Sequence, residues 1–261
     1  MVSFSSWKSS LSTAVVAGVL AVGISSTLMV AQESGQDNQL KVDVMKALDK
    51  KQFRDVKAEV QGGVVTLSGA VRTYADKEDA DRRVHHRRTV QAVRNDIEVR
   101  GGPEVDDVTL RNKLAEKLTY DRIGYGTTAF NSITIGVQHG VVTLGGTAYG
   151  PVDKDSAVSL VANYPGVRDI VDNIEVAPLS PNDDRIRVEA ARAIYGYPML
   201  NKYAIDPAKP IRITVVNGNL TLTGVVNSQA DKDVANIQAN GVSGVFKVTN
   251  NLQVAGRDIN R

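Results

Sequence analysis

Apolar residues recur every four positions in three stretches of the chain. The three sets are Leu40, Val44 and Leu48, then Leu110, Leu114 and Leu118, and then Ile186, Ala190 and Ile194. A spacing of four places these side chains on one face of an α-helix. Each stretch therefore predicts an amphipathic helix that packs its apolar face against a core.

Alternating apolar and polar residues follow each predicted helix. The apolar positions of a first segment are Val56, Ala58 and Val60, then Ile133, Ile135 and Val137, and then Ile211, Ile213 and Val215. A second segment alternates in the same way, with Val65 and Leu67, Val142 and Leu144, or Leu220 and Leu222 as its apolar members. A period of two predicts β-strands with one buried face and one polar face.

Two-residue links join the paired strands: Gly62-Gly63, His139-Gly140 and Asn217-Gly218. A type I′ hairpin needs positive φ at both central residues, which Gly and Asn adopt most readily. We therefore predict three β-hairpins. Histidine is also enriched in the left-handed region, so we interpret His139 as a turn residue and not as a metal ligand.

These elements belong to one unit that is repeated three times. Offsets of 77 and 78 residues align the strands ending at Gly69, Gly146 and Gly224, and also the closing strands ending at Val99, Val176 and Val254. A second helix is predicted between them, with Thr73 and Ser228 as N-caps and Pro151 in the first turn of the middle copy. Each copy is thus predicted to be αββαβ, and its strand-end glycine is expected to let a helix approach the sheet closely.

The second predicted helix of every copy begins with a charged triplet. The triplets are Asp76-Lys77-Glu78, Asp153-Lys154-Asp155 and Asp231-Lys232-Asp233. Paired carboxylates are compatible with acid/base chemistry or metal binding, but no histidine recurs beside them. Acidic residues in a first turn also complement the helix macrodipole, and we favour that structural interpretation.

The predicted fold class is α+β: three tandem αββαβ modules, each a three-stranded mixed sheet with two helices on one face, after an N-terminal signal or anchor helix. The modules are expected at residues 38–100, 104–177 and 182–255, and the signal peptide or membrane anchor at residues 1–31.

The N-terminal segment Leu11 to Ala31 has no charged residue and follows Lys8, which is typical of a secretory signal. Cleavage after Ala31 would place Met29, which is not small, at the third position before the cut, so an uncleaved inner-membrane anchor through residues 11–31 stays open. We favour cleavage. Either way the modules are expected in the periplasm, which argues against nucleic acid as a partner.

The repeated unit resembles the BON domain, a small module of bacterial osmotically inducible and nodulation proteins. The resemblance rests on the Gly-x-Val-x-Leu-x-Gly strand and on a closing segment seen as Gly166-Val167, Ile170, Asn173 and Ile174, and as Gly244-Val245, Val248, Asn251 and Leu252. Copy one departs from it at Thr89 and Asp96. The resemblance implies a periplasmic or outer-membrane-associated protein, often stress-induced, that binds phospholipid surfaces or acts as a protein-binding module or chaperone, without catalytic residues.

Composition narrows the chemistry further. The 261 residues include 31 basic and 29 acidic residues and no cysteine, which excludes disulfides, thiolate metal sites and a cysteine nucleophile. No group of nucleophile, base and orienting residue recurs, and the glycines do not form a phosphate-binding loop. We therefore expect no enzymatic activity, no cofactor and no metal site.

Charge is unevenly distributed among the copies. Residues 38–100 hold 14 basic and 10 acidic groups, residues 104–177 hold 6 and 10, and residues 182–261 hold 10 and 7. The most basic segment contains Arg82, Arg83, Arg87 and Arg88, around His85 and His86. One interpretation is a contact with anionic lipid. The other, which we favour, is a solvated helix end whose cations complement the dipole.

Aromatic residues gather between the first helix and the first strand of copies two and three. They include Tyr120, Tyr125 and Phe130 in copy two and Tyr195, Tyr197 and Tyr203 in copy three. Exposed, they would suit a membrane contact or a client-binding rim. Folded back, they would cap the open end of a small core, which is the interpretation that we favour.

Two non-enzymatic functions therefore lead. The first is binding to phospholipid membrane surfaces in support of the envelope under osmotic stress. The second is a periplasmic chaperone or a module that binds envelope proteins through the polar sheet face, a strand edge or the tyrosine loops. The lipid, the client and the oligomeric state stay open.

Overall fold

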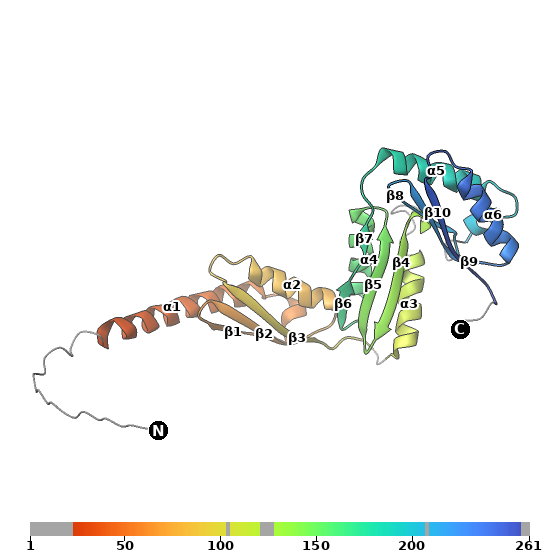
Figure 1. The fold of residues 1–261 in the computed structure, drawn as a ribbon. Coiled ribbons are helices and arrows are strands. Elements are labelled where there is room, and N and C mark those ends of the chain that lie inside the picture. The colour runs from red at the N-terminus through yellow and green to blue at the C-terminus, as the bar shows by residue number, and fades with distance from the viewer. Residues whose placement is uncertain (1–22, 103–104, 121–127, 207–208, 257–261) are drawn as a thin grey trace, which may run out of the picture.

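The computed structural model describes residues 23–102, 105–120, 128–206 and 209–256, and side-chain burial from residue 35 onward. It contains three αββαβ modules in tandem, which confirms the predicted fold class. Figure 1 shows them in sequence order, with the third module lying against one end of the second. We number them modules 1 to 3.

Module 1 begins with a longer helix than the periodicity predicted. Its elements are α1 (Gly23–Ala47), the 3-10 turn η1 (Lys51–Phe53), β1 (Val56–Gln61), β2 (Val64–Val71), α2 (Tyr74–His85) and β3 (Ala92–Val99). Helix α1 continues across the boundary expected between the signal or anchor and the first module, because no residue from Gly23 onward interrupts the helical backbone. Residues 1–22 lie outside the described residues, and no helix within the described part is long and apolar enough to span a membrane.

Modules 2 and 3 repeat this order. Module 2 comprises α3 (Asp107–Tyr120), η2 (Thr128–Phe130), β4 (Ser132–Gln138), β5 (Val141–Ala148), α4 (Pro151–Ala162), β6 (Asp169–Asp172) and β7 (Glu175–Val176). Module 3 comprises α5 (Pro181–Tyr195), η3 (Asn201–Ala204), β8 (Arg212–Val216), β9 (Asn219–Val226), α6 (Gln229–Asn240) and β10 (Lys247–Val254). Strands β6 and β7 are two pieces of one closing strand, since both pair with β5.

Each sheet is mixed, with the middle strand antiparallel to the first and parallel to the last. Apolar side chains point to the face that the two helices cover, so every module has its own core. In module 1 that core includes Leu40 and Val44 from α1, Leu67 from β2 and Val84 from α2. We call the opposite, helix-free side of each sheet its open face.

The hairpin turns have the predicted geometry. Both central residues have positive φ in all three copies, including His139 at 51° and Asn217 at 52°. The prediction for the strand-end glycines was wrong. Gly69 is exposed with φ of 108°, and a Cβ there would lie 2.0 Å from the backbone oxygen of Asp55, so glycine is required by the preceding chain and not by a helix.

Candidate functional site

The hairpin end of each module is tied to its first helix by one aspartate. In module 1 the carboxylate of Asp37 accepts hydrogen bonds from the backbone N–H groups of Gly62 at 2.7 Å and Gly63 at 3.0 Å. The same pair of bonds joins Asp107 to His139 and Gly140, and Asp183 to Asn217 and Gly218. These bonds lower the pKa of Asp107. The hairpin turn of each module is therefore held against the N-terminal part of its first helix.

The sequence did contain a signal for this aspartate. Asp37, Asp107 and Asp183 each stand three residues before the first apolar residue of the first helix, Leu40, Leu110 or Ile186. The apolar pattern starts only at these residues, so it did not predict a role for the acid that precedes them. A carboxylate can satisfy two adjacent backbone donors in a turn, which explains why an acid recurs there.

The basic segment of module 1 lies at the C-terminal end of α2. Arg82 and Arg83 both pair with Asp79, at 3.0 Å and 2.8 Å. These arginine hydrogen bonds hold the pKa of Asp79 below its usual range, against the opposing effect of burial. One acid thus neutralises part of the charge that the sequence places on this helix.

Arg87 and Arg88 differ from the two helical arginines. Helix α2 ends at His85, and both residues lie exposed in the turn that follows. Arg87 donates to the backbone oxygen of Arg83, and neither residue has an ion-pair partner within the described part of the chain. The free positive charge of this segment is concentrated in the turn.

This basic turn lies at the end of module 1 from which α1 extends toward the N-terminus. The backbone N–H of Gln91, just after the turn, donates a hydrogen bond to the backbone oxygen of Gly63 at 2.9 Å. The backbone N–H of Gly63 in turn donates to the carboxylate of Asp37 in α1. Figure 1 shows α1 leaving the module on this side. The basic turn and the N-terminal part of α1 therefore share one end of the molecule.

The tyrosine loop of module 3 folds back onto the core. Tyr203 is 4% exposed; its hydroxyl donates to Asp231 at 2.9 Å and accepts from the backbone of Asn227 at 2.7 Å. Tyr195 donates its hydroxyl to the backbone oxygen of Ile211 at 2.5 Å, and burial raises its pKa. Neither hydroxyl is available to an external ligand.

The remaining tyrosines are more accessible. Tyr120 ends α3 and Tyr197 lies in the loop of module 3, and both side chains are exposed. Tyr125 falls outside the described residues. Phe130 packs onto a different module from its own, because it contacts the core of module 3. The loop of module 3 therefore packs on its own core, whereas Phe130 of module 2 packs on the neighbouring module.

The charged triplets hold these loops in place. Asp76 forms a capping box with Thr73, as its first-turn position predicted. Asp153 and Asp231 are buried and also reach the preceding loop: Asp153 accepts from Asn131 at 2.9 Å, and Asp231 accepts from Tyr203 and from Lys202 at 3.0 Å. In modules 2 and 3 the first aspartate of the triplet thus anchors the long loop that precedes the first strand.

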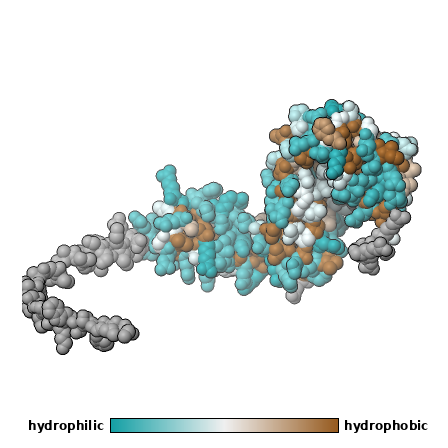
Figure 2. Space-filling model, viewed as in Figure 1, coloured by the Kyte–Doolittle hydropathy of each residue, from teal (hydrophilic) through white to brown (hydrophobic). Residues whose placement is uncertain are grey.

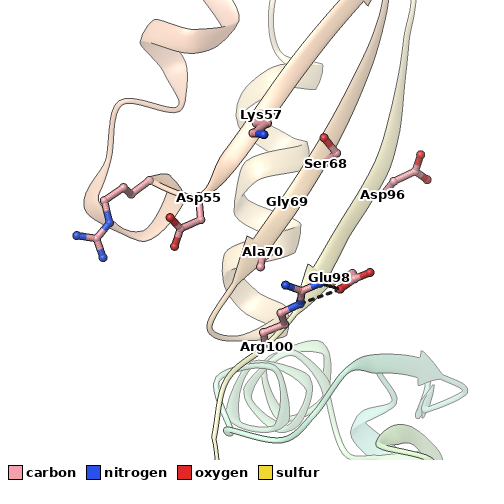
Figure 3. Close-up of a pocket in the computed structure, with 9 residues that line it drawn as sticks. Asp55, Lys57, Ser68, Gly69, Ala70, Asp96, Glu98 and Arg100 are labelled. Atoms are coloured by element: carbon pink, nitrogen blue, oxygen red, sulfur yellow. Dashed lines mark hydrogen bonds and ion pairs between the residues drawn. The ribbon is translucent and has the colours of Figure 1, made fainter.

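The open face of module 1 is a shallow, charged depression of about 560 Å³. Figure 3 shows Lys57 on β1, Asp96 and Glu98 on β3, and Arg100 just after β3, which forms an ion pair with Glu98 at 2.6 Å. Positive and negative groups alternate, so neither an anion nor a cation is favoured. Within the described residues, no cluster of three potential ligands for a metal occurs, and no buried side-chain polar atom lacks a partner.

The same face of module 3 is covered by module 2. Turn η2 packs against β8, and Thr214 on the open face of β8 is only 9% exposed. The hydroxyls of Ser132 in β4 and Thr223 in β9 lie 2.9 Å apart. Phe130 packs against the module 3 core and lies 5.9 Å, centroid to centroid, from the ring of Tyr149. Modules 2 and 3 are therefore in direct contact through packed and hydrogen-bonded side chains.

Arg187 completes this interface. It is 2% exposed and places its guanidinium 4.9 Å from the centroid of the Tyr149 ring, a cation–π arrangement across the two modules. Its Nη2 donates to the backbone oxygen of Val215 at 2.6 Å, and its Nη1 pairs with Asp184. These bonds compensate for burying the charge.

The described residues thus form three small α+β modules in tandem, each with a sheet face that its own helices leave open. The BON domain family model matches residues 36–101, 106–178 and 199–256, so the chain belongs to the BON domain family. BON domains are associated with envelope and membrane-related proteins.

Two solved structures are similar to parts of this chain. One is CdsD, a structural protein of the Type III secretion system of Chlamydia trachomatis, with 16% identity over 83% of this chain and 92% of that chain, and a TM-score of 0.24. The other is the C-terminal domain of CdsD, with 15% identity over 82% and 96%, and a TM-score of 0.23. No curated protein matches the chain.

Proposed function

We propose that this chain is a non-enzymatic envelope protein that binds phospholipid membrane surfaces through the basic end of module 1. The observation that supports it most is the exposed turn with Arg87 and Arg88, which has no acidic partner within the described residues. Basic groups near an anionic surface contribute about 1 kcal/mol each. The turn shares its end of the module with α1, which leads to the apolar segment at residues 11–31.

The proposal combines an electrostatic contact at the basic turn with a hydrophobic contact through residues 11–31. If residues 11–31 insert into the inner membrane, the basic turn faces the lipid headgroups. If they are removed, the turn alone gives weaker, salt-dependent binding in the periplasm. In both cases the protein supports the envelope, and osmotic stress is the condition that we propose for its action.

Vesicle co-sedimentation tests this proposal. The protein should comprise residues 35–261, which omits the apolar segment but keeps Asp37 and its hairpin bonds. Binding to vesicles rich in phosphatidylglycerol is expected, with little binding to phosphatidylcholine alone. The double change Arg87→Ser and Arg88→Ser should weaken binding about 30-fold, the equivalent of about 2 kcal/mol.

The matched control removes the same charge elsewhere. Arg111→Ser with Lys113→Ser changes two exposed residues of α3, in the acidic module 2, and should leave vesicle binding unaltered. Equal binding by the Arg87/Arg88 double variant and the unmodified protein, at low and at moderate salt, would refute the proposed contact.

A second candidate function is binding of unfolded or partly folded envelope proteins. Exposed apolar side chains on module 3 favour it, notably Phe246 at 81% and Ile237 at 64% exposure. Suppression of client aggregation without vesicle binding would support this second function over the first. Replacement of Phe246 by Ser should then reduce the suppression.

A further inference from the structure

The interface between modules 2 and 3 follows a simple rule of construction. Phe130 of η2 and Ser132 at the start of β4 both contact module 3, so this part of module 2 covers the open face of the next module. The acceptor face of β8 and β9 presents Thr214 and Thr223, and also the partly buried Arg212. A loop is thus the donor and an open sheet face is the acceptor.

Loop length explains why module 2 itself is left uncovered. The last apolar residue of the first helix and the first of the next strand are 8 positions apart in module 1, but 15 in module 2 and 17 in module 3. The short loop of module 1 contains only η1, whose Phe53 is buried in the module's own core. Accordingly Thr134, Gly136 and Thr143 on the open face of module 2 are exposed.

Module 3 has a long loop but no following module within the described residues. Its residues Tyr197, Met199 and Ile205 are exposed, Ile205 at 79%. The loop is held rigidly, because Tyr203 between them is buried and bonded to Asp231. In the interface of modules 2 and 3 the corresponding element is η2, which packs against β8 and whose Phe130 contacts module 3.

Two open faces remain as acceptors, and they differ in charge. The face of module 1 contains Lys57, Glu59 and Asp96, whose burial would cost desolvation energy. The centre of the face of module 2 is formed by threonine and glycine, with Val171 43% exposed at its side, and Gln138 and Glu175 are exposed toward its ends. Figure 2 shows this region of the middle module in white and brown, in contrast to the hydrophilic surface of module 1. The face of module 2 suits an apolar loop better.

We propose that the loop at residues 197–205 of one copy packs onto the open face of module 2 in a second copy, at Thr134, Gly136 and Thr143. The two surfaces are different patches of the chain, so the contact is heterologous. Successive copies therefore associate head to tail, into a ring if the rotation closes and a filament if it does not.

Cysteine cross-linking of the full chain tests this contact, because the chain has no cysteine of its own. Gly136→Cys is tolerated, since a Cβ at that position has no atom within 4 Å. Ile205→Cys changes an exposed side chain. After mild oxidation, a mixture of the two single variants should give a disulfide-linked dimer on a non-reducing gel, whereas each variant alone should stay monomeric.

The control uses the charged acceptor face. Lys57→Cys is as exposed and is expected to give no dimer with Ile205→Cys. A dimer with Lys57→Cys but not with Gly136→Cys would overturn the choice of module 2. A dimer of Gly136→Cys with itself would instead indicate a symmetric face-to-face contact and overturn the head-to-tail arrangement, as would the absence of cross-linking in every mixture.

A second measurement avoids engineered cysteines. Sedimentation velocity of the full chain should give a sedimentation coefficient that rises with protein concentration. Ile205→Glu should abolish that rise while leaving the circular dichroism spectrum unaltered, because the residue does not belong to the core. A concentration-dependent rise that persists in Ile205→Glu would contradict the proposal.

Discussion

Modules 1 and 3 are built on the same frame, yet their sheet faces are used in opposite ways. At equivalent positions module 1 has Lys57 and Ser68, which meet solvent at least in part, while module 3 has the partly buried Arg212 and has Thr223, whose hydroxyl lies 2.9 Å from that of Ser132 in module 2. The helix-covered faces do not differ in kind, since both are filled by aliphatic residues. The two modules therefore differ on their open faces, not in their cores.

A basic residue on the first helix makes the same point. Lys41, Arg111 and Arg187 occupy equivalent positions, but only Arg187 is buried. The difference comes from Tyr149 of the neighbouring module, which supplies an aromatic face for the guanidinium. A basic residue at this repeated position is thus buried only where a side chain of the neighbouring module covers it.

The largest expected effect is on the cores. Leu67→Ala in module 1 and Leu222→Ala in module 3 each remove a fully buried side chain and should cost about 2–5 kcal/mol of unfolding free energy. Because module 2 packs on module 3, Leu222→Ala should also increase hydrogen exchange at residues 128–132. Leu67→Ala should not. Exchange changes confined to module 3 would show that its interface with module 2 is not stabilising.

A smaller effect is expected at the interface itself. Arg187→Ala removes the bond to Val215 and the contact with Tyr149, and should destabilise module 3 by about 2 kcal/mol. Lys41→Ala, its exposed counterpart, should stay within about 0.5 kcal/mol of the unmodified protein. Denaturant unfolding of both variants provides the measurement, and equal effects would contradict the structural difference.

Acid should affect the loop anchor of module 3. Burial raises the pKa of Asp231, but hydrogen bonds from Lys202, Ser228 and Tyr203 outweigh it and hold the pKa below its usual range. A depressed folded pKa gives stability that is present above the unfolded pKa of about 3.9 and is lost as pH falls through the folded value. Asp231→Asn should therefore be less stable than the unmodified protein at pH 7, by about 1–3 kcal/mol.

The same comparison at low pH gives the control. The difference in unfolding free energy between Asp231→Asn and the unmodified protein should shrink at pH 3. Asp76→Asn alters the equivalent residue of module 1, which only caps α2, and should cost about 1 kcal/mol or less at pH 7. A difference for Asp231→Asn that is constant with pH would mean that its charge has no part in anchoring the loop.

The smallest effect is expected on the open face of module 1. Lys57→Thr, which gives module 1 the residue type of the equivalent Thr134 in module 2, should change the unfolding free energy by less than about 0.5 kcal/mol. Thr214→Lys, in contrast, forces a charge into the covered face of module 3 and should separate modules 2 and 3. Small-angle scattering would detect that separation as a larger radius of gyration, and an unaltered radius would argue against the interface.

Much of each module could be predicted from neighbouring residues. The hairpins follow from pairs such as Asn217-Gly218, and the helix starts from caps such as Thr73 and Ser228. The residue at which α2 ends could not be predicted, since periodicity does not show where the turn after His85 begins. The partner of Phe130 could not be predicted, because it lies in another module.

The sequence by itself determined the αββαβ unit, its three copies and the conformations of its turns, because these depend on local backbone preference and on the period of apolar residues. Tertiary structure alone decided which open face is covered, which of three equivalent basic residues is buried and which loop still lacks an acceptor within the described residues. Those features depend on contacts between modules, and such contacts join residues far apart in the chain whose pairing no local pattern encodes.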